Sequence, residues 1–250
     1  MKNICFVIRG GYDAKFIIAE LNSRSIDACF TYIIEGGGIA RRQKLKRMIR
    51  KQNIVVAFVN ICALLIYDHI MLNRMKTICG HPDYPKECDY INVDDVNDYE
   101  CQIEVRSKNP DLVLVYGSGI LKAETIEAFG GNIYNIHSSI LPYYRNVHSD
   151  FWAYMDNRKE LIGVTVFKLE SGIDTGEIAI QYRCDLPGNA KLHEYKAKNL
   201  ENIPSMVEDF IAKFFAGQVI LKPQDLKEGS VAKTPELKDI IHFFKAEGRA

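Results

Sequence analysis

Apolar residues gather in short runs along the chain, and most of these runs end close to glycine. The runs over residues 2–8 and 28–34 are rich in β-branched and aromatic side chains, and one polar residue separates each run from a group of glycines. Apolar side chains between residues 16 and 21 then recur at helical spacing. A strand, a glycine turn and a helix in this order open an α/β unit.

The middle of the chain continues this alternation. Residues 112–116 (LVLVY) form a continuous apolar run, which is typical of a central parallel strand covered on both faces. Residues 164–169 and 178–184 alternate between apolar and polar, so they predict a β-hairpin joined by the glycine-rich loop 170–177. A further strand is predicted over 132–136, and helices are predicted over 99–108, 122–129 and 199–215.

These elements predict an α/β fold, in which helices cover both faces of a Rossmann-like, open, mostly parallel sheet. The hairpin and a short C-terminal extension complete it. We expect a catalytic domain over residues 1–185, and over 186–250 an extension that contains a helix, a small hairpin and a terminal helix.

One region departs from the α/β pattern. Residues 41–51 carry seven basic side chains around Leu45, Met48 and Ile49, which predicts a helix with one apolar stripe and cationic flanks. The apolar stretch 54–72 predicts a buried or interfacial helix, because its charge-free part is shorter than the roughly 20 residues that cross a bilayer. No transmembrane segment is expected. The basic face is either solvated, or part of a peripheral membrane contact through 41–72.

Composition narrows the class of protein. The 250 residues include 32 Lys and Arg against 32 Asp and Glu, and this balance argues against a surface devoted to nucleic acid. Seven scattered cysteines, and an N-terminal run too short for a secretory signal, predict a cytoplasmic protein. Their spacing relative to histidine fits no zinc pattern, so no metal site is expected.

The candidate chemistry lies where strands end, because open α/β sheets place their sites at the carboxyl edge. Asn135 and His137 are two residues apart at the end of a predicted strand, so their side chains share one face. An Asn amide can donate to a developing oxyanion, and a His beside Asp174 can donate or move a proton. No Ser or Cys nucleophile is paired with this His. The pattern therefore predicts acyl transfer in which the substrate supplies the nucleophile.

Three sequence blocks between residues 109 and 181 carry a family resemblance: NPDLVLVYGSGIL, NIHSSILPYYRNVHSDFWAY and GVTVFKLESGIDTGEIAIQ. In this order they resemble the formyltransferases that use N10-formyltetrahydrofolate. The resemblance implies that this folate is the co-substrate and that Asn135, His137 and Asp174 form the catalytic trio. It implies that the pteridine is bound by the backbone of Tyr116, Gly117, Ser118, Gly119, Ile120, Leu121, Glu170, Ser171, Gly172 and Ile173.

The acceptor side of the site is less defined. The resemblance places a substrate-binding basic residue at Arg145, followed by Asn146 where many relatives have Gly, and His148 is a candidate acceptor contact. Arg9, Gly10 and Gly11 end the first strand, where backbone N–H groups can face a phosphate.

Size and tail resemble the enzymes that formylate a nucleotide-linked amino-deoxysugar for surface polysaccharide. The relatives that act on tRNA carry an additional C-terminal barrel, for which too few residues follow Cys184. The alternatives are a formyltetrahydrofolate hydrolase, a formyltransferase for another small amine, and a non-catalytic nucleotide- or folate-binding module. Apolar residues of the hairpin or the tail could form a homodimer interface.

Overall fold

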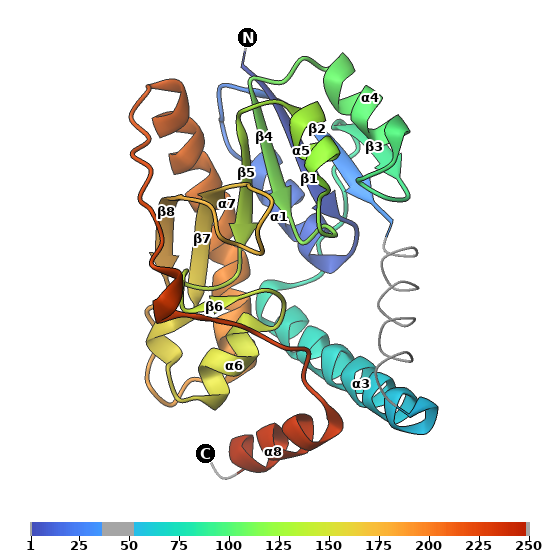
Figure 1. Cartoon of the computed structure of the whole chain (residues 1–250), viewed down its shortest axis with the longest axis vertical. Coiled ribbons are helices and arrows are strands. Elements are labelled where there is room, and N and C mark those ends of the chain that lie inside the picture. Colours follow the sequence, from blue (N-terminus) through green and yellow to red (C-terminus); the bar gives the residue numbers. More distant parts are fainter. Residues whose placement is uncertain (1, 37–52, 249–250) are drawn as a thin grey trace.

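A seven-stranded mixed sheet forms the centre of the computed structural model, which describes residues 2–36 and 53–248 (Figure 1). The strand order is β3-β2-β1-β4-β5-β7-β8, and the first five strands of this order run parallel. Strands β7 and β8 continue the sheet antiparallel to their neighbours. The strands are β1 (Asn3–Arg9), β2 (Cys29–Glu35), β3 (Asp89–Val93), β4 (Leu112–Tyr116), β5 (Ile133–His137), β7 (Gly163–Lys168) and β8 (Ile178–Arg183).

Helices cover both faces of this sheet, because alternate side chains of the central strands are apolar on both sides. Phe6 and Ile8 of β1 pack against α1 and α7, whereas Cys5 and Val7 pack towards α4 and α5. The predicted Rossmann-like α/β fold is thereby confirmed. The sheet-covering helices are α1 (Tyr12–Asn22), α4 (Tyr99–Ser107), α5 (Ala123–Phe129) and α7 (Leu192–Phe215).

A second apolar cluster lies beyond the end of the sheet. It joins α3 (Ile54–Cys79), α6 (Ser149–Met155) and α8 (Leu237–Glu247) to the first turn of α7. Tyr67 of α3 is central to it, since its ring lies 5.5 Å from that of Phe151 and 5.6 Å from that of Phe243. The first half of α3 extends away from the sheet (Figure 1).

The hairpin of β7 and β8 is confirmed, but other predicted bounds change. α3 continues to Cys79 rather than ending at Leu72, and α7 begins at Leu192 rather than Asn199. Strand β3 has no counterpart in the predicted elements. The basic segment 41–51 lies outside the described residues.

The predicted small hairpin in the C-terminal extension is wrong within the described residues. β9 (Ser230–Val231) instead pairs in parallel with β6 (Tyr144–Arg145), and Lys222 forms an isolated bridge with Ile178. The extension therefore pairs with two segments of the catalytic region rather than with itself. The predicted division at residue 185 stays a prediction, although α7 contributes to the core on the sheet.

Candidate active site

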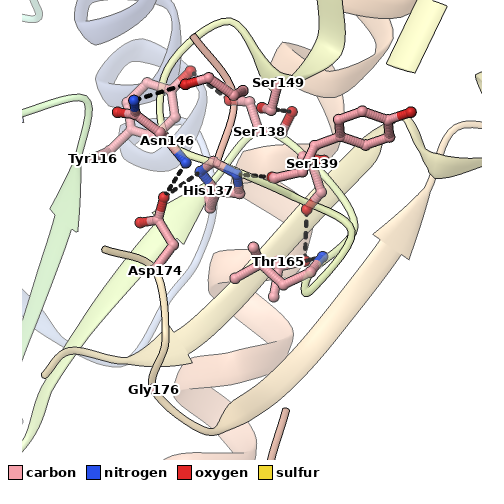
Figure 2. A network of polar contacts seen from close by, with 12 residues as sticks. Tyr116, His137, Ser138, Ser139, Asn146, Ser149, Thr165, Asp174 and Gly176 are labelled. Atoms are coloured by element: carbon pink, nitrogen blue, oxygen red, sulfur yellow. Dashed lines mark hydrogen bonds and ion pairs between the residues drawn. The ribbon is translucent and has the colours of Figure 1, made fainter. Parts of the chain in front are cut away.

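His137 ends β5 with both ring nitrogens facing oxygen atoms (Figure 2). Its Nε2 lies 2.9 Å from the carbonyl oxygen of Tyr144, and its Nδ1 lies 3.7 Å from Oδ2 of Asp174. A carbonyl oxygen only accepts, so Nε2 carries a hydrogen and Nδ1 is the nitrogen that faces the carboxylate. The His137 and Asp174 side chains are 10% and 15% exposed, so the pair is mostly buried but still accessible to solvent.

Asp174 is held in place by two neighbouring segments. The backbone N–H of Asn146 donates to Oδ2 of Asp174 at 2.6 Å. The side-chain amide of Gln224 donates to the carbonyl oxygens of Asp174, at 3.1 Å, and of Gly176. Asp174 itself has a φ of 50°, in the left-handed region, so its loop needs this support.

Asn146 occupies the position at which the family resemblance predicts glycine. Its φ is 75°, a backbone conformation that favours glycine and that asparagine adopts more readily than most other residues. Its side-chain amide also donates to the carbonyl oxygen of Ala232 at 2.9 Å. Asn146 therefore keeps the turn beside Asp174 and adds a bond to the extension.

Asn135 lies on β5 two residues before His137, half-buried between β4 and β7. The strand alternation puts both side chains on the same face of the sheet, as predicted. The structure thus brings His137 and Asp174 together across the chain and places Asn135 next to them along one strand.

The segment after β4 is fixed by a buried carboxylate that sequence reasoning missed. Glu35, 2% exposed at the end of β2, accepts from the backbone N–H of Gly119 at 3.1 Å and of Val96 at 3.4 Å. Arg9 donates to the same carboxylate at 3.4 Å. A charged residue that ends an apolar strand just before a glycine run was the available signal. Glu35 ties three strand-end segments together.

Both predicted folate loops reach the surface. Gly117 has a φ of 65°, where a side chain would strain the turn, and Ile120 is 68% exposed. In the second loop Glu170, Ser171, Gly172 and Ile173 lie between β7 and Asp174, and Ile173 is 43% exposed. These loops offer backbone groups and apolar side chains at the edge where His137 lies.

A group of half-buried polar residues lies on the helix side of the same edge. The hydroxyl of Tyr116 donates to Oδ2 of Asp13 at 3.3 Å and lies 3.5 Å from Oγ of Ser138. Burial raises the pKa of the Asp13 carboxyl, although Lys196 and Tyr116 oppose the shift. Burial, with the carboxylate of Asp13, raises the pKa of Tyr116 well above its ordinary value. Tyr116 therefore acts as a neutral hydrogen-bond donor.

Asp150 and Lys196 form a buried ion pair, with Nζ 2.5 Å from Oδ2. Burial alone would raise the pKa of Asp150, but the ammonium of Lys196 outweighs it and holds that pKa below its usual range. Burial would likewise lower the pKa of Lys196, and the carboxylate of Asp150 raises it instead. The two groups hold each other charged.

The predicted phosphate-binding turn is occupied by contacts within the chain. Arg9 is paired with Glu35, and the N–H of Gly10 donates to the carbonyl oxygen of Glu35 at 3.0 Å. The N–H of Gly11 donates to the hydroxyl of Tyr84 at 3.5 Å.

A cavity of about 620 Å³ adjoins this turn. Acidic residues dominate its polar lining, and neither His137 nor Asp174 lines it; the acidic residues are Glu35, Asp94, Asp98, Glu100 and Glu104. Carboxylates repel an anion, so the cavity is a poor match for phosphate.

Arg145 and His148 lie nearer to the reactive pair. Arg145 belongs to β6, directly before the Asn146 N–H that binds Asp174, and its buried Nε has no hydrogen-bond partner in the described part of the chain. His148 has a φ of 58° and contributes to the lowered pKa of Asp150. Between residues 2–36 and 53–248, no three His, Cys, Asp or Glu residues gather as a metal ion would require.

Comparison with known proteins identifies relatives of this arrangement. The family model described as formyl transferase matches residues 2–207. A methionyl-tRNA formyltransferase of Kosmotoga olearia is 29% identical over 138 residues, which are 55% of this chain and 44% of that protein. The chain spans about half the length of the curated relatives that it matches.

Solved structures share the fold. Glycinamide ribonucleotide transformylase 1 of Symbiobacterium toebii aligns with a TM-score of 0.59 and 17% identity, over 90% of this chain and 95% of that one. The formyltransferase PseJ of Anoxybacillus kamchatkensis, solved with UDP-4,6-dideoxy-4-formamido-L-AltNAc and tetrahydrofolate, aligns with a TM-score of 0.51 and 23% identity. It covers 71% of this chain and 85% of PseJ.

Proposed function

Since this chain belongs to the formyl transferase family, we propose that it transfers a formyl group from N10-formyltetrahydrofolate to a primary amine. The observation that carries the proposal is the approach of His137 Nδ1 to Asp174 at the carboxyl edge of the sheet, with Asn135 on the same strand face. The edge supplies hydrogen-bond donors and a carboxylate, and the nucleophile comes from the substrate.

In the proposed reaction the neutral amine attacks the formyl carbon, and the carbonyl oxygen becomes an oxyanion. The amide of Asn135 and Nδ1–H of protonated His137 donate to that oxyanion. Nε2–H is already donated to Tyr144, so Nδ1 must supply this bond. Its 3.7 Å separation from Asp174 is too long for a hydrogen bond, which leaves Nδ1–H available to the oxyanion.

Asp174 then accepts the proton that the amine loses, directly or through water. The oxyanion then re-forms the carbonyl as the bond between the formyl carbon and N10 breaks. N10 takes the same proton from Asp174, directly or through water, and tetrahydrofolate and the formamide leave. Asp174 suits this role because Asn146 and Gln224 hold its loop at the reactive edge.

The two surface loops are the proposed folate site. The backbone of residues 116–121 and 170–173 would bind the pteridine edge, with exposed Ile120 and Ile173 offering apolar contact to the ring. Asp174 directly follows the second loop, so a pteridine bound there would present its formyl group to His137.

For the acceptor we propose the amino group of a nucleotide-linked amino-deoxysugar, used in the cytoplasm to build surface polysaccharide. Arg145 supports an acceptor that carries phosphate, since its buried Nε has no hydrogen-bond partner among the described residues and it adjoins the Asn146–Asp174 contact. PseJ was solved with a nucleotide-linked formamido-deoxysugar and tetrahydrofolate, which supports the same acceptor class.

The test incubates the purified protein with formyl donor and a panel of amino-sugar nucleotides, and reads the mass gain of one formyl group. Product with at least one nucleotide sugar is expected. Formate released without any amine would indicate a hydrolase, and folate binding without turnover would indicate a binding module. Formylation of Met-tRNA or glycinamide ribonucleotide alone would overturn the acceptor proposal but leave formyl transfer intact.

Variants test the trio within that assay. Asn135→Ala, His137→Ala and Asp174→Ala should each lower turnover by at least ~10²–10³ and remain folded, because each removes a group that acts on the transition state. Asn132→Ala is the matched control, since this exposed Asn lies just before the far end of β5. Near-wild-type turnover of His137→Ala would eliminate the assignment.

A further inference from the structure

The first half of helix α3 is apolar on two opposite faces. Its inner face packs on the protein, with Ala57, Leu64 and Tyr67 buried and Asn60 Oδ1 accepting from the backbone N–H of Leu237 at 3.0 Å. The opposite face is exposed. We call it the outer face, and its six residues are Ile54, Val55, Phe58, Val59, Leu65 and Ile66.

The outer face is continuous rather than a scatter of single residues. At 100° per residue, positions 54, 58 and 65 align along the helix, and positions 55, 59 and 66 lie beside them. All six side chains are between 39% and 67% exposed. A helix of a soluble domain ordinarily turns polar residues outward, so an apolar face of this length indicates a binding surface.

Hydropathy supports the same view. Among the described residues α3 is the single helix long and apolar enough, by length and composition, to cross a membrane. Only 33% of its most apolar 18-residue window is buried, whereas the core helix of a soluble protein would be mostly buried. Packing against the described residues 2–36 and 53–248 therefore does not explain the apolar character of α3.

The charge next to the outer face indicates what covers it. Seven of the eleven residues from Arg41 to Lys51 are basic, and no Asp or Glu occurs between Gly36 and Tyr67. The whole chain has no net formal charge, so the positive charge of this stretch is a local excess. These residues lie outside the described part of the chain, and their charge follows from the sequence.

A partner for the outer face must accept apolar side chains and be negatively charged. A second copy of this chain carries the same seven positive charges in the sequence just before its own α3, so it does not supply the opposite charge. A membrane surface that contains anionic lipid combines acyl chains with negative headgroups, and basic residues beside an apolar helix face are typical of helices that lie in such an interface. We propose that the outer face of α3 docks the protein onto an anionic membrane surface.

The helix lies on the membrane rather than across it. Its inner face is committed to α6 and α8 through Tyr67 and Asn60, and a spanning helix would have to break those contacts. Asp68 and His69 also follow directly after the charge-free stretch. The docking surface does not depend on which amine is formylated.

The experiment is co-sedimentation of the full chain with two kinds of vesicle: phosphatidylcholine alone, and phosphatidylcholine mixed with phosphatidylglycerol. Binding to the mixed vesicles should be at least about tenfold tighter at low salt and should weaken as salt is added. Equal binding to both vesicles, or none to the mixed ones, would overturn the proposal.

A pair of variants separates the apolar and the charged contribution. Phe58→Ser combined with Leu65→Ser should weaken binding to mixed vesicles at least about tenfold, as should Lys46→Glu combined with Arg47→Glu. The control is Ile220→Ser, which changes a 74% exposed apolar residue outside α3 and should bind as wild type. Circular dichroism and formyl transfer in solution should be unchanged in every variant.

Two further outcomes would show that the outer face of α3 is covered in another way. Protein that stays with vesicles after an alkaline carbonate wash would show a spanning helix and overturn a peripheral contact. A lipid-free dimer that Phe58→Ser with Leu65→Ser converts to monomer, with vesicle binding unchanged, would show that a second copy covers the outer face. Vesicle binding and oligomeric state are both measured without formyl transfer, so they test the docking surface even if the protein transfers no formyl group.

Discussion

The carboxyl edge of the sheet and the outer face of α3 are opposite departures from ordinary packing. At the sheet edge, charged and polar side chains are buried inside an apolar body, as with Glu35, Asp150 and His137. On α3, large apolar side chains such as Phe58 and Leu65 stand in solvent. A folded chain retains either arrangement only at a cost in stability.

The two regions differ in how completely that cost is offset within the chain. Glu35 accepts three hydrogen bonds, and Asp150 is paired with Lys196. Within the described part of the chain the outer face of α3 stays exposed, with its six side chains between 39% and 67% exposed. Buried polar groups that are hydrogen-bonded within the chain are typical of a preformed site for a small molecule. Exposed apolar area is typical of a surface that binds a large partner. Three measurements test this distinction, in decreasing order of expected effect.

Lys196→Met tests whether the buried polar groups depend on one another. It leaves the Asp150 carboxylate buried without its ammonium, and we expect the free energy of unfolding to fall by about 3–5 kcal/mol at neutral pH in urea titration. Because the pKa of Asp150 is lowered in the wild type, the pair contributes stability above the ordinary Asp pKa and loses it as pH falls through the lowered value. The loss in Lys196→Met should therefore shrink in acid. A loss that is independent of pH would show that packing rather than charge matters at this position.

Neighbouring leucines of α3 test whether its two faces differ. Leu64 is 7% exposed and Leu65 is 57% exposed, so they form a matched pair on one helix. Leu64→Ala should lower the free energy of unfolding by about 2–5 kcal/mol, whereas Leu65→Ala should change it by less than about 0.5 kcal/mol. Equal losses, measured without lipid, would mean that the outer face is covered in solution and would remove the contrast.

Arg145→Ala tests a predicted substrate contact whose buried Nε, like that of Arg9, has no hydrogen-bond partner in the described residues, and which lies beside the Asn146–Asp174 contact. Loss of a charged hydrogen bond to a phosphate should raise the KM for the acceptor about ten- to a hundredfold and leave the KM for the formyl donor unchanged. Arg183→Ala serves as the control, because this arginine already donates to the carbonyl oxygen of Glu160. A change in kcat alone would place Arg145 with the catalytic groups instead.

Sequence reasoning predicted the central strands because each is a short apolar run closed by a turn. It missed β3 because Asp89–Val93 is a five-residue edge strand whose side chains are at most half-buried, so no alternation marks it. The start of α7 was missed because residues 192–198 are rich in charge, although Leu192 and Tyr195 are buried.

The proposed reactive residues of the candidate site were predictable from the sequence, but the contacts that support them were not. Asn135 and His137 follow from strand alternation, and the family resemblance supplied the role of Asp174. The contacts that hold them were not predictable from local pattern, because the Tyr144 carbonyl, the Asn146 N–H and the Gln224 amide are backbone groups or come from distant segments. Only the folded chain shows that residue 224 supports residue 174.

That last contact has an evolutionary consequence. The residues that would react lie in the first three quarters of the chain. The tail holds the Asp174 loop through the hydrogen bonds of Gln224, and the carbonyl oxygen of Ala232 holds Asn146 nearby. Changes in the tail can therefore adjust the position of the carboxylate by fractions of an ångström while every reactive group is inherited intact. Lineages of this family could thus diverge in rate or acceptor preference through a segment that carries none of the proposed reactive groups.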